Sequence, residues 1–588
     1  MCGILGITAS GSETEAAIER GIGTLNRRGP DDRGMLAFPG CTLANTRLAI
    51  IDLAGGHQPI ADSERGTAIV LNGEIYNYRE LRRTLEGFGH QFVTESDTEV
   101  ILKAYAQYGQ KCPEHLDGMF AFAIWDDRNQ ELFLARDRFG EKPLFYALDG
   151  DALIFASEIK ALLATGRVGT KLDPVSLDNY LALLYVPPWR TIYADIRTIK
   201  PGFSALYKNG RLTQNRYWQI RRQPLRISRE EAAESIRDML AQSVHSRLVA
   251  DVEVGVLLSG GVDSSIVATL AQAASSRRIK TFSAGFEGFI DELPYAAAVA
   301  AAAGTDHREE QIRADLLDAF ETAAGYFDEP FADSSNVPTH LISAAARKSV
   351  KVVLSGDGGD ELFLGYGHYR KHRHLPRLAR LARELLSPPL ARFKKRAISH
   401  FSPRERARLA KDPHAVEVDP TDHVDLSAGE TPVEKMNLID LAMGLPGDML
   451  TKVDRSSMMH SLEVRCPFLN PGLAQFAYNL PVEYKLGPGR GKLILERAFA
   501  GKLPAEVFTR PKQGFGAPVK DWLAKPEFRG YVEKTLLADG RVGQFLKPEV
   551  VRHYVEAFYA GRTSLQYRIW TLLALEAWCR SREQAGLA

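Results

Sequence analysis

The chain has 588 residues, of which 45% are hydrophobic and 25% are charged, and its formal net charge is +1. A chain of this length is expected to hold several domains, each able to bury a core. The balanced charge gives no reason to expect nucleic acid or an anionic membrane surface as a partner.

The cysteines are few and widely spaced: Cys2, Cys41, Cys112, Cys466 and Cys579. They form no CxxC pair, so neither a zinc site nor a disulfide framework is indicated, and a reducing compartment is favoured. No basic segment followed by an apolar one opens the chain, so no signal peptide is expected. The apolar stretch 295–304 is too short to span a bilayer. We therefore expect a cytoplasmic protein.

The first 210 residues, roughly, predict a strand-rich α+β part with mostly antiparallel sheets and helices packed outside them. A helical pattern covers 97–109. The expected strands are short apolar or alternating runs, bounded by Asn, Asp and Gly turns, at 41–50, 67–76, 120–127, 131–137 and 152–157.

From residue 223 the pattern changes to a linker and an amphipathic helix within 223–249, and then to apolar strands that alternate with helices. Buried strands that are each followed by a helix are typical of a parallel α/β sheet. The strands are expected within 252–261, 279–286 and 350–360, and the helices within 263–274 and 294–304. The rest of the chain is mainly helical in pattern. Its basic run at 366–412 is interpreted as a solvated helical face.

The N-terminal Met1-Cys2 pair allows two interpretations. Removal of Met1 would leave a free α-amine, with a pKa near ~8, on the residue that bears a thiol with a pKa near ~8.5. Such an amine can relay the thiol proton, as in N-terminal nucleophiles. Alternatively, Cys2 is a small buried residue at the start of a strand.

Four motifs accompany Cys2: "NRRGPDD" (26–32), "TRLAIIDL" (46–53), "LNGEIYNY" (71–78) and "ESDTEV" (95–100). Together with Cys2 they resemble the class II glutamine amidotransferases. That resemblance implies an N-terminal nucleophile hydrolase fold, an αββα sandwich with antiparallel sheets.

The resemblance also implies roles. The Asn72 side chain and the Gly73 N–H would stabilise the oxyanion of glutamine hydrolysis. Arg47 would bind the α-carboxylate of glutamine, and Asp97 its α-ammonium, with Glu74 completing the pocket. The alternatives are a turn at "NGE", a surface ion pair for Arg47, and for Asp97 a place after Ser96 in a Ser-x-x-Glu capping box, where it complements the helix dipole.

A phosphate-binding loop is indicated where the strand within 252–261 meets the next helix. Small residues and successive N–H groups at a helix N-terminus suit a phosphate group, and no Walker A sequence occurs in the chain. The stretch resembles the pyrophosphate loop of the ATP-pyrophosphatase family, although a plain Ser/Gly turn is the alternative. The loop residues are Ser259, Gly260, Gly261, Asp263, Ser264 and Ser265.

A second strand ends in "SGDGGDELF" (355–363), and both loops should meet at the carboxyl edge of one sheet. Asp263 and Asp360 are candidates to hold Mg²⁺ against ATP phosphates. Lys492, which follows the glycine-rich stretch 487–491 in "GPGRGKLILE", suits the leaving pyrophosphate; its alternative is an ordinary surface lysine. Positions that match nucleoside contacts in the family are Leu258, Ala284, Ser355 and Gly356.

With "DMLTKVDRSSMMHSLEVRCPFLN" (448–470), the whole chain is similar to the glutamine-hydrolysing asparagine synthetases. This resemblance implies a glutaminase domain at 2–212 and, at 213–588, a parallel-sheet ATP-pyrophosphatase domain (adenine nucleotide α-hydrolase-like) with a helical C-terminal part. It implies the substrates glutamine, aspartate and ATP, a β-aspartyl-AMP intermediate, channelled ammonia and possibly a homodimer.

The match differs at Asp357, where many members of the family have Glu. In those members the Glu assists adenylate formation and the attack of ammonia. The shorter side chain leaves a second hypothesis open, namely the same chemistry on another carboxylate, such as a uronic acid of a surface polysaccharide or a secondary metabolite. A third hypothesis is a non-catalytic nucleotide-binding regulatory protein, which predicts the loss of key residues. The candidate residues named above are all present.

Overall fold

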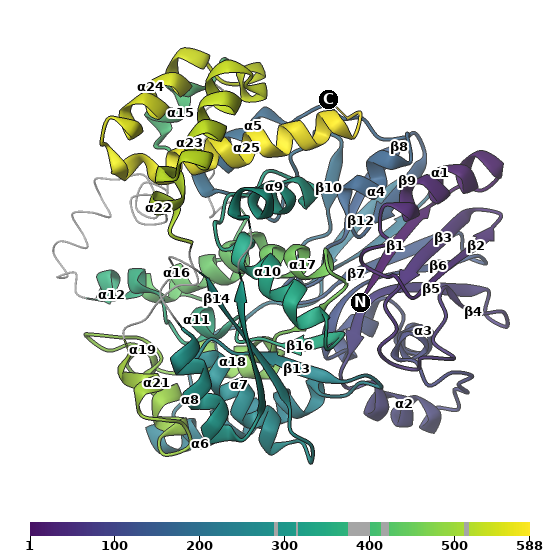
Figure 1. The fold of residues 1–588 in the computed structure, drawn as a ribbon. Helices are drawn as coiled ribbons and strands as arrows, with labels where there is room; N and C mark the ends of the chain where they lie inside the picture. Colours follow the sequence, from purple (N-terminus) through teal and green to yellow (C-terminus); the bar gives the residue numbers. More distant parts are fainter. Residues whose placement is uncertain (287–291, 313–314, 374–399, 413–422, 511–516, 588) are drawn as a thin grey trace.

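The computed structural model of the chain describes residues 1–286, 292–312, 315–373, 400–412, 423–510 and 517–587 (Figure 1). Two antiparallel sheets form the N-terminal part, with the strand orders β10-β8-β9-β1-β3-β2 and β12-β11-β7-β6-β5-β4. The first contains β1 Cys2–Ile7, β2 Asp32–Phe38, β3 Cys41–Arg47, β8 Phe145–Asp149, β9 Ala152–Ala156 and β10 Ile196–Thr198. The second contains β4 Ile60–Asp62, β5 Thr67–Ile75, β6 Gly118–Asp126, β7 Glu131–Arg136, β11 Phe203–Lys208 and β12 Arg211–Arg216.

The two sheets pack face to face over an apolar core to which Ile4 and Leu43 contribute from one sheet, and Val70 and Trp125 from the other. Helices α1 Ser12–Gly23 and α4 Ile159–Ala164 contact the first sheet, and α3 Asp97–Tyr108 contacts the second, with α2 Tyr78–Gly87 packed against α3. The expected αββα sandwich is confirmed, because each sheet buries one face on the other sheet and one face under helices.

The second part is built on a parallel sheet with the order β15-β14-β13-β16-β17. Its strands are β13 Val254–Leu257, β14 Lys280–Phe286, β15 Asp306–Ile312, β16 Val352–Leu354 and β17 Glu463–Arg465. The helices that accompany it include α6 Arg229–Arg247, α7 Val262–Ala273, α8 Leu293–Ala303 and α10 Asn336–Arg347. The predicted strands and helices are present, and the two edge strands, β15 and β17, are additions to the prediction.

The connection between the two parts runs over residues 217–228, because β12 still belongs to an antiparallel sheet and α6 begins at Arg229. Beyond the parallel sheet the chain is mainly helical, and its last helices gather at the top of Figure 1, where α25 packs on α9. The remaining helices are α5 Pro174–Leu183, α9 Leu316–Tyr326, α11 Gly359–Leu362, α12 Gly367–Arg373, α15 Pro403–Leu409, α16 Pro432–Ile439, α17 Leu450–Met458, α18 Pro471–Asn479, α19 Val482–Lys485, α20 Leu493–Phe499, α21 Glu506–Thr509, α22 Val519–Ala524, α23 Pro526–Val532, α24 Pro548–Tyr559 and α25 Gln566–Gln584.

Most of the basic run at 366–412 lies outside the described residues. Within α15, however, Arg406 is only 1% exposed, and its Nε donates to Asp178 Oδ1 at 2.8 Å. The interpretation of this run as a solvated face is therefore wrong at Arg406, where a buried carboxylate on α5 provides a partner.

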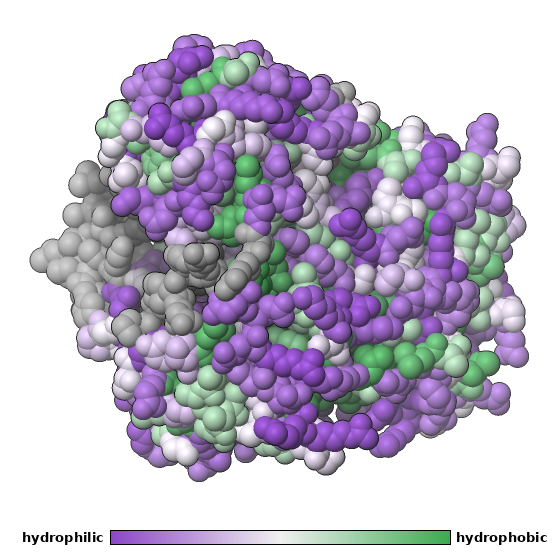
Figure 2. All heavy atoms as spheres, viewed as in Figure 1, coloured by the Kyte–Doolittle hydropathy of each residue, from purple (hydrophilic) through white to green (hydrophobic). Residues whose placement is uncertain are grey.

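The surface seen in Figure 2 is mainly hydrophilic, with apolar side chains in small groups. Among the described residues, no helix combines the length and the apolar character that a bilayer crossing needs. The charged groups that matter more to the architecture are buried at the junction of the two parts.

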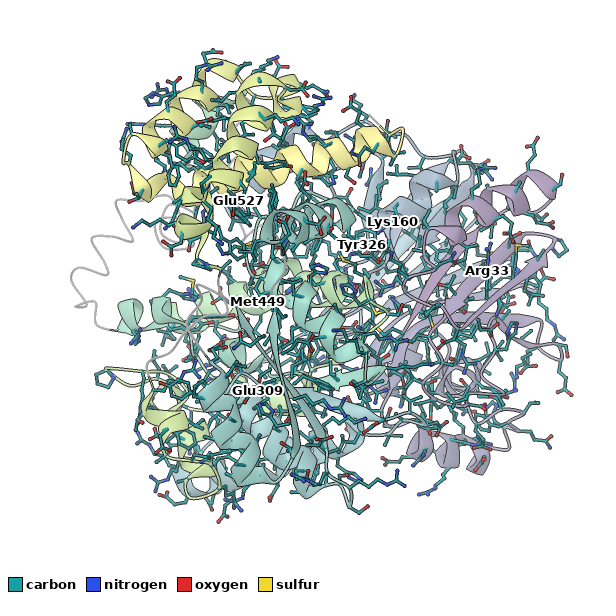
Figure 3. The ribbon with its side chains drawn as sticks, viewed as in Figure 1. Arg33, Lys160, Glu309, Tyr326, Met449 and Glu527 are labelled. Carbon is teal, nitrogen blue, oxygen red and sulfur yellow. The ribbon has the colours of Figure 1, made fainter. Side chains whose placement is uncertain are left out.

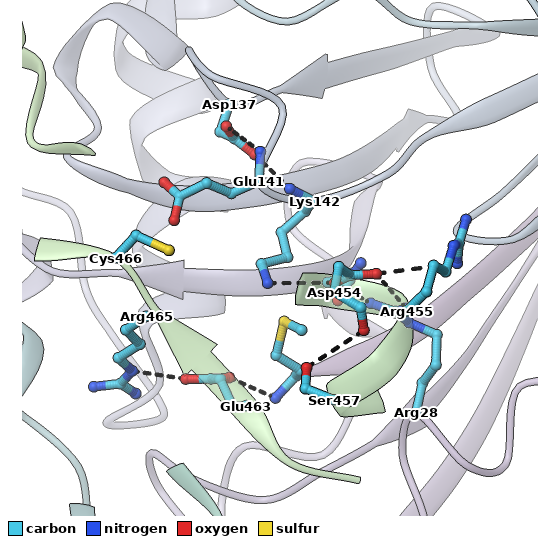
Figure 4. A network of polar contacts seen from close by, with 12 residues as sticks. Arg28, Asp137, Glu141, Lys142, Asp454, Arg455, Ser457, Glu463, Arg465 and Cys466 are labelled. Atoms are coloured by element: carbon cyan, nitrogen blue, oxygen red, sulfur yellow. Dashed lines mark hydrogen bonds and ion pairs between the residues drawn. The ribbon is translucent and has the colours of Figure 1, made fainter. Parts of the chain in front are cut away.

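The junction is held by buried ion pairs. Arg28, in the turn after α1, donates to Asp454 on α17 at 2.8 and 3.0 Å and to Glu158 at 2.8 Å. Arg455 reaches the same Glu158 at 2.6 Å, and Lys142 lies 3.4 Å from Asp454 (Figure 4). These side chains are at most 6% exposed. Nearby, the Lys160 ammonium lies 3.7 Å from the centre of the Tyr326 ring (Figure 3).

Breaking this cluster should destabilise the junction. Replacing Arg28 with leucine leaves carboxylates of both parts buried with one cation fewer, and the loss of one partner of a buried pair costs about 3–5 kcal/mol. We expect the thermal unfolding midpoint measured by calorimetry to fall by several degrees. Arg552→Leu, which removes a half-exposed arginine of α24, is the control and should leave the midpoint unchanged. Equal midpoints for the two variants would contradict the role given to Arg28.

Candidate active sites

Cys2 begins β1 and pairs across the sheet with Arg47 of β3. Its residue is 5% exposed, and its backbone N–H donates to Asn72 Oδ1 at 3.2 Å. Burial raises the pKa of the Cys2 thiol, while the N-terminal ammonium, Asn45 and Arg47 act to lower it. The fold thus brings together Cys2, Arg47 and Asn72 from three strands.

The Met1 ammonium is buried and lies 2.8 Å from Glu463 Oε2 on β17. Its charge lowers the pKa of the Glu463 carboxyl and also acts on that of Glu74. The first amine of the chain therefore lies among carboxylates. Removal of Met1 would release this anionic pocket for another ammonium group, and the new amine would be carried by Cys2.

Asn72 on β5 is completely buried, and within the described part of the chain its Nδ2 has no hydrogen-bond partner. A buried N–H donor without an acceptor is rare and needs an explanation. The next residue, Gly73, lies so close to β6 that a Cβ would come 2.1 Å from the Met119 carbonyl oxygen. The position therefore requires glycine. These two predicted oxyanion donors are adjacent and lie beside Cys2.

Arg47 is 6% exposed, and its guanidinium donates to the carbonyls of Ile51 at 3.0 Å and Asp52 at 2.7 Å. The alternative of a surface ion pair is therefore wrong. Carbonyl partners fix the orientation of the guanidinium without neutralising its charge. Arg47 can consequently attract an anion to the Cys2 site.

Asp97 is the first residue of α3, and its Oδ2 accepts from the Ile75 N–H at 2.9 Å. Burial raises the pKa of Asp97 to about 6, against the Ile75 hydrogen bond. Ser96 caps the helix by accepting from the Thr98 N–H. The reciprocal capping box is not formed, because Glu99 instead accepts from backbone N–H groups at 93–94.

Sequence reasoning gave no role to two residues of β17 that complete this site. Arg465 lies 3.2 Å from Glu74 and 2.7 Å from Glu463, and it is fully buried (Figure 4). Burial raises the pKa of Glu74, and Glu463 raises it further, with Arg465 opposing both. The only available signal was the presence of two charges in the short, otherwise apolar stretch "LEVRCPFL".

The loop between β13 and α7 is organised by its serines. Ser264 Oγ accepts from the Ser259 N–H at 3.2 Å, and the two hydroxyls are 3.0 Å apart. Gly260 has φ +70°, and a Cβ there would lie 2.7 Å from Ala296 N. A non-glycine residue is excluded at this position by the backbone of α8. The loop therefore places α7's N-terminus close to the sheet edge.

The loop after β16 meets the first loop, as the order of the parallel strands predicts. A Cβ on Gly356 would lie 2.8 Å from Asp263 Cβ, and one on Gly359 would lie 2.5 Å from Asp263 Cγ. Ser355 Oγ donates to Asp357 Oδ2 at 2.7 Å. The small residues thus allow both loops to converge around Asp263 at the carboxyl edge of the sheet.

Lys492 lies between the two predicted metal-binding carboxylates. Its Nζ is 2.6 Å from Asp360 Oδ1 and also contacts Asp263 Oδ2. Burial acts to lower the pKa of Lys492, but the two carboxylates outweigh it and hold the pKa above its usual value. The side chain is 13% exposed, so the alternative of an ordinary surface lysine is wrong.

A cavity of about 920 Å³ unites these groups. Two loop residues do not line it: Gly260, and Ser265, which is buried in α7. Residues that sequence reasoning missed in its wall include Asp333, Ser335, Met449 and Lys452. Predicted residues in the wall are Leu258, Ser259, Gly261, Asp263, Ser264, Ala284, Ser355, Gly356, Asp357, Asp360 and Lys492.

The donor set of this cavity fits Mg²⁺ bound together with a nucleotide. Mg²⁺ usually takes one or two carboxylates and completes its shell with water and phosphate oxygens. Asp263 and Asp360 are close enough to share one cation, since both contact the same ammonium. Among the described residues there is no cluster of three or more His, Cys, Asp or Glu side chains suited to a metal held by protein alone.

Two family models match the chain. The model described as "Glutamine amidotransferase domain" matches residues 1–218, and the model described as "Asparagine synthase" matches residues 235–580. The first covers the sandwich with Cys2, and the second covers the parallel sheet with both loops and Lys492.

Curated relatives match over nearly the whole chain. "Asparagine synthetase [glutamine-hydrolyzing] 1" of Bacillus subtilis is 31% identical, and the alignment covers 98% of this chain and 96% of the relative. "Putative asparagine synthetase [glutamine-hydrolyzing]" of Mycobacterium tuberculosis is 36% identical, with 98% and 97% covered. "Amidase chry2" of Gibberella zeae is 28% identical, with 90% and 91% covered. By these matches, the chain belongs to the glutamine-hydrolysing asparagine synthetase family, whose members are glutamine-dependent amidotransferases.

Proposed function

We propose that this chain makes asparagine from aspartate, glutamine and ATP, and releases glutamate, AMP and pyrophosphate. The observation that carries the proposal is the placement of Lys492 between Asp263 and Asp360 in the 920 Å³ cavity that also contains Asp357. A cation held by two carboxylates at the meeting point of two phosphate-type loops suits the departure of pyrophosphate. We infer a glutaminase domain that begins at residue 2 and a synthetase domain that runs to 588. The boundary expected at 212 is moved into the connection 217–228, because β12 belongs to the antiparallel sheet.

In the glutaminase half, the amine of a trimmed Cys2 takes the thiol proton, and the thiolate attacks the amide carbon of glutamine. Asn72 Nδ2 and the Gly73 N–H donate to the oxyanion that forms. When the adduct collapses, the C–N bond breaks and the protonated amine gives its proton to the leaving ammonia; water then hydrolyses the remaining thioester to glutamate. Arg47 binds the α-carboxylate of glutamine. Asp97, with Glu74 beside it, binds the α-ammonium of glutamine. In the untrimmed chain the Met1 ammonium lies in the same pocket, where its charge acts on Glu74.

In the synthetase half, Leu258 and Ala284 contact the nucleoside, and the serines of both loops donate to phosphates. Asp263 and Asp360 would hold Mg²⁺, which would neutralise phosphate charge. The acceptor carboxylate attacks the α-phosphate and forms an acyl-adenylate, while pyrophosphate leaves toward Lys492. Ammonia then attacks the acyl carbon and displaces AMP. Asp357 lies in the second loop, where the family role of a longer Glu is expected.

We infer that ammonia passes through the interior along β17. Glu463 of this strand contacts the N-terminus, and the next residue after the strand, Cys466, lies 3.6 Å from Ser355 Oγ in the synthetase cavity. A dry passage keeps ammonia unprotonated and raises its local concentration.

The five cysteines are free and buried, which supports an enzyme of the reducing cytoplasm. We also propose a homodimer, which rests on the family resemblance alone.

A second candidate function is the amidation of a different carboxylate. It is favoured by the match to a relative named amidase and by Asp357 in place of Glu. The two functions share every step except recognition of the acceptor, so identification of the amidated product separates them.

The proposal is tested with the wild-type protein and Cys2→Ala, supplied with ATP, Mg²⁺, a panel of carboxylic acids, and either glutamine or ammonium. We expect mass spectrometry to detect asparagine, AMP and pyrophosphate with the wild type. Cys2→Ala should lose synthesis from glutamine and keep it with ammonium, because only the nitrogen source needs the thiol. ADP as the nucleotide product, or equal loss with both nitrogen sources in a folded variant, would refute the two-site reaction.

The role of Asn72 predicts a selective loss of glutaminase turnover. Asn72→Ala removes one of two oxyanion donors, which lowers kcat by about 100- to 1000-fold and leaves KM for glutamine nearly unchanged. Glutamate release measures both constants. Asn129→Ala, in the exposed turn after β6, is the matched control and should behave like the wild type. A loss that falls on KM alone would exclude Asn72 as an oxyanion donor.

The pKa of Asp97, raised to about 6, predicts how glutamine binding depends on pH. Above pH 6 the carboxyl is ionised and attracts the glutamine ammonium; as the pH falls through 6, Asp97 becomes neutral and this attraction is lost. Calorimetry with Cys2→Ala, which binds glutamine without consuming it, should give a Kd about tenfold weaker at pH 5 than at pH 8. Asp97→Asn in the same background should bind weakly at both pH values, and an unchanged pH dependence would remove Asp97 from the site.

A further inference from the structure

We propose that Lys452 and Asp333 grip the acceptor as an α-amino acid, Lys452 at its α-carboxylate and Asp333 at its α-ammonium. This proposal rests on the amidation reaction proposed above and names the residues that select the acceptor. It separates the two candidate functions, because a sugar acid without an amino group leaves one half of the pair unused.

Both residues line the cavity that holds Asp357 and the two loops. Lys452 lies in the first turn of α17, and Asp333 lies in the loop before α10. Because α10 packs on α17, the two residues are brought side by side. Figure 3 shows Met449, which is one helical turn before Lys452, at the centre of the molecule between the parallel sheet and the C-terminal helices. The pair is thus on the interior wall of the site.

The contacts of the Lys452 ammonium leave it short of one good acceptor. Its Nζ donates to Asp333 Oδ2 at 3.2 Å, to Ser335 Oγ at 2.9 Å and to the Met449 sulfur at 3.5 Å. A thioether is a weak acceptor, so a carboxylate oxygen of a ligand would be a far better third partner. Met449 also lines the cavity, so a carboxylate that replaces its sulfur as a partner of Lys452 would come from the side open to substrate.

Asp333 is held ready as an anion. Its Oδ1 accepts from the Ser335 N–H at 3.0 Å, and its Oδ2 accepts from Ser335 Oγ at 2.7 Å. Burial acts to raise the pKa of Asp333, but Lys452 and Ser335 lower it further than burial raises it. Asp448 is close by, and burial and the neighbouring Asp333 raise its pKa well above the usual value, which disfavours a second anion beside Asp333.

A fixed cation and a fixed anion in contact are complementary to an amino acid, which carries the opposite charges on two groups attached to the same carbon. A ligand with only one of these charges leaves either Lys452 or Asp333 without a charged partner in the complex. A site of this kind selects strongly against such a ligand. Aspartate, bound in this way by its α-groups, keeps its β-carboxylate free for adenylation.

Three acids that share the carboxylate to be activated test the clamp: aspartate, succinate, which lacks the α-ammonium, and 3-aminopropanoate, which lacks the α-carboxylate. Pyrophosphate release is measured with ammonium as the nitrogen source, so that the glutaminase site does not contribute. We expect the wild type to prefer aspartate over each analogue by about 100-fold or more in kcat/KM.

The variants assign each charge to its residue. Lys452→Met should lower kcat/KM for aspartate to the level for 3-aminopropanoate and leave 3-aminopropanoate unaffected. Asp333→Asn should remove the advantage of aspartate over succinate. KM for ATP and the glutaminase rate should stay at wild-type values, which shows that the variants fold. Lys348→Met, which removes an exposed lysine after α10, is the charge control and should change nothing.

Three outcomes overturn the clamp: a wild type that turns over succinate or a uronic acid as well as aspartate, a uniform loss for all acids in both variants, or a wild-type response in both. The substrate panel alone decides the matter should a variant fail to fold. Absence of pyrophosphate release with every acid would instead overturn the proposed function, so the two failures are distinguishable.

Discussion

The buried ion pairs between Arg28, Glu158, Asp454 and Arg455 fix the position of one half of the molecule on the other. Taking such charges out of water is costly, and their attraction offsets the cost only when the partners are placed accurately. An arrangement shifted by a few ångströms would leave several charges buried without partners. We take the network as a device that specifies one arrangement of the two halves, and its contacts cross from the sandwich to α17.

The stretch from α17 to the end of β17 carries this constraint to both sites. Within it, Lys452 faces the synthetase cavity, Asp454 is held by Arg28, and Glu463 binds the N-terminal amine. Ser355, on the second loop, donates its N–H to the Arg465 carbonyl at 2.9 Å. One continuous segment therefore touches the amine beside Cys2, the junction and the 920 Å³ cavity. Any shift of that segment moves both sites together.

The local patterns of the sequence were sufficient to predict much of this. Strands such as β5 and β13 and the helix α7 have clear periodicity or turn signals, and Gly260, Gly356 and Gly359 are at loop positions where a Cβ has no room. Cys2, Asn72 and Asp97 could be named because their motifs are short and specific. The structure brings these residues together, although their chemical roles remain predictions.

Other features depend on contacts that the sequence does not encode locally. β17 has three residues and β15 is largely polar, so neither shows the run of apolar residues expected of a buried strand. Glu463 becomes part of the glutaminase site through an ion pair with residue 1, which is 462 positions away. Lys452 and Asp333 are 119 positions apart and become a pair only when α10 and α17 pack. Long-range pairing of this kind has no local signal to read.

The central claim is that the two sites work as one unit through a closed interior. It is tested most directly by supplying the wild-type protein with glutamine labelled with ¹⁵N at the amide, together with ATP, the acceptor and unlabelled ammonium at a concentration that supports little synthesis by itself, and by measuring the label in the amide product. The account predicts that the product keeps nearly the full label of glutamine, because the nitrogen does not mix with the solution. A product whose label is diluted to the composition of the free ammonium pool would contradict it.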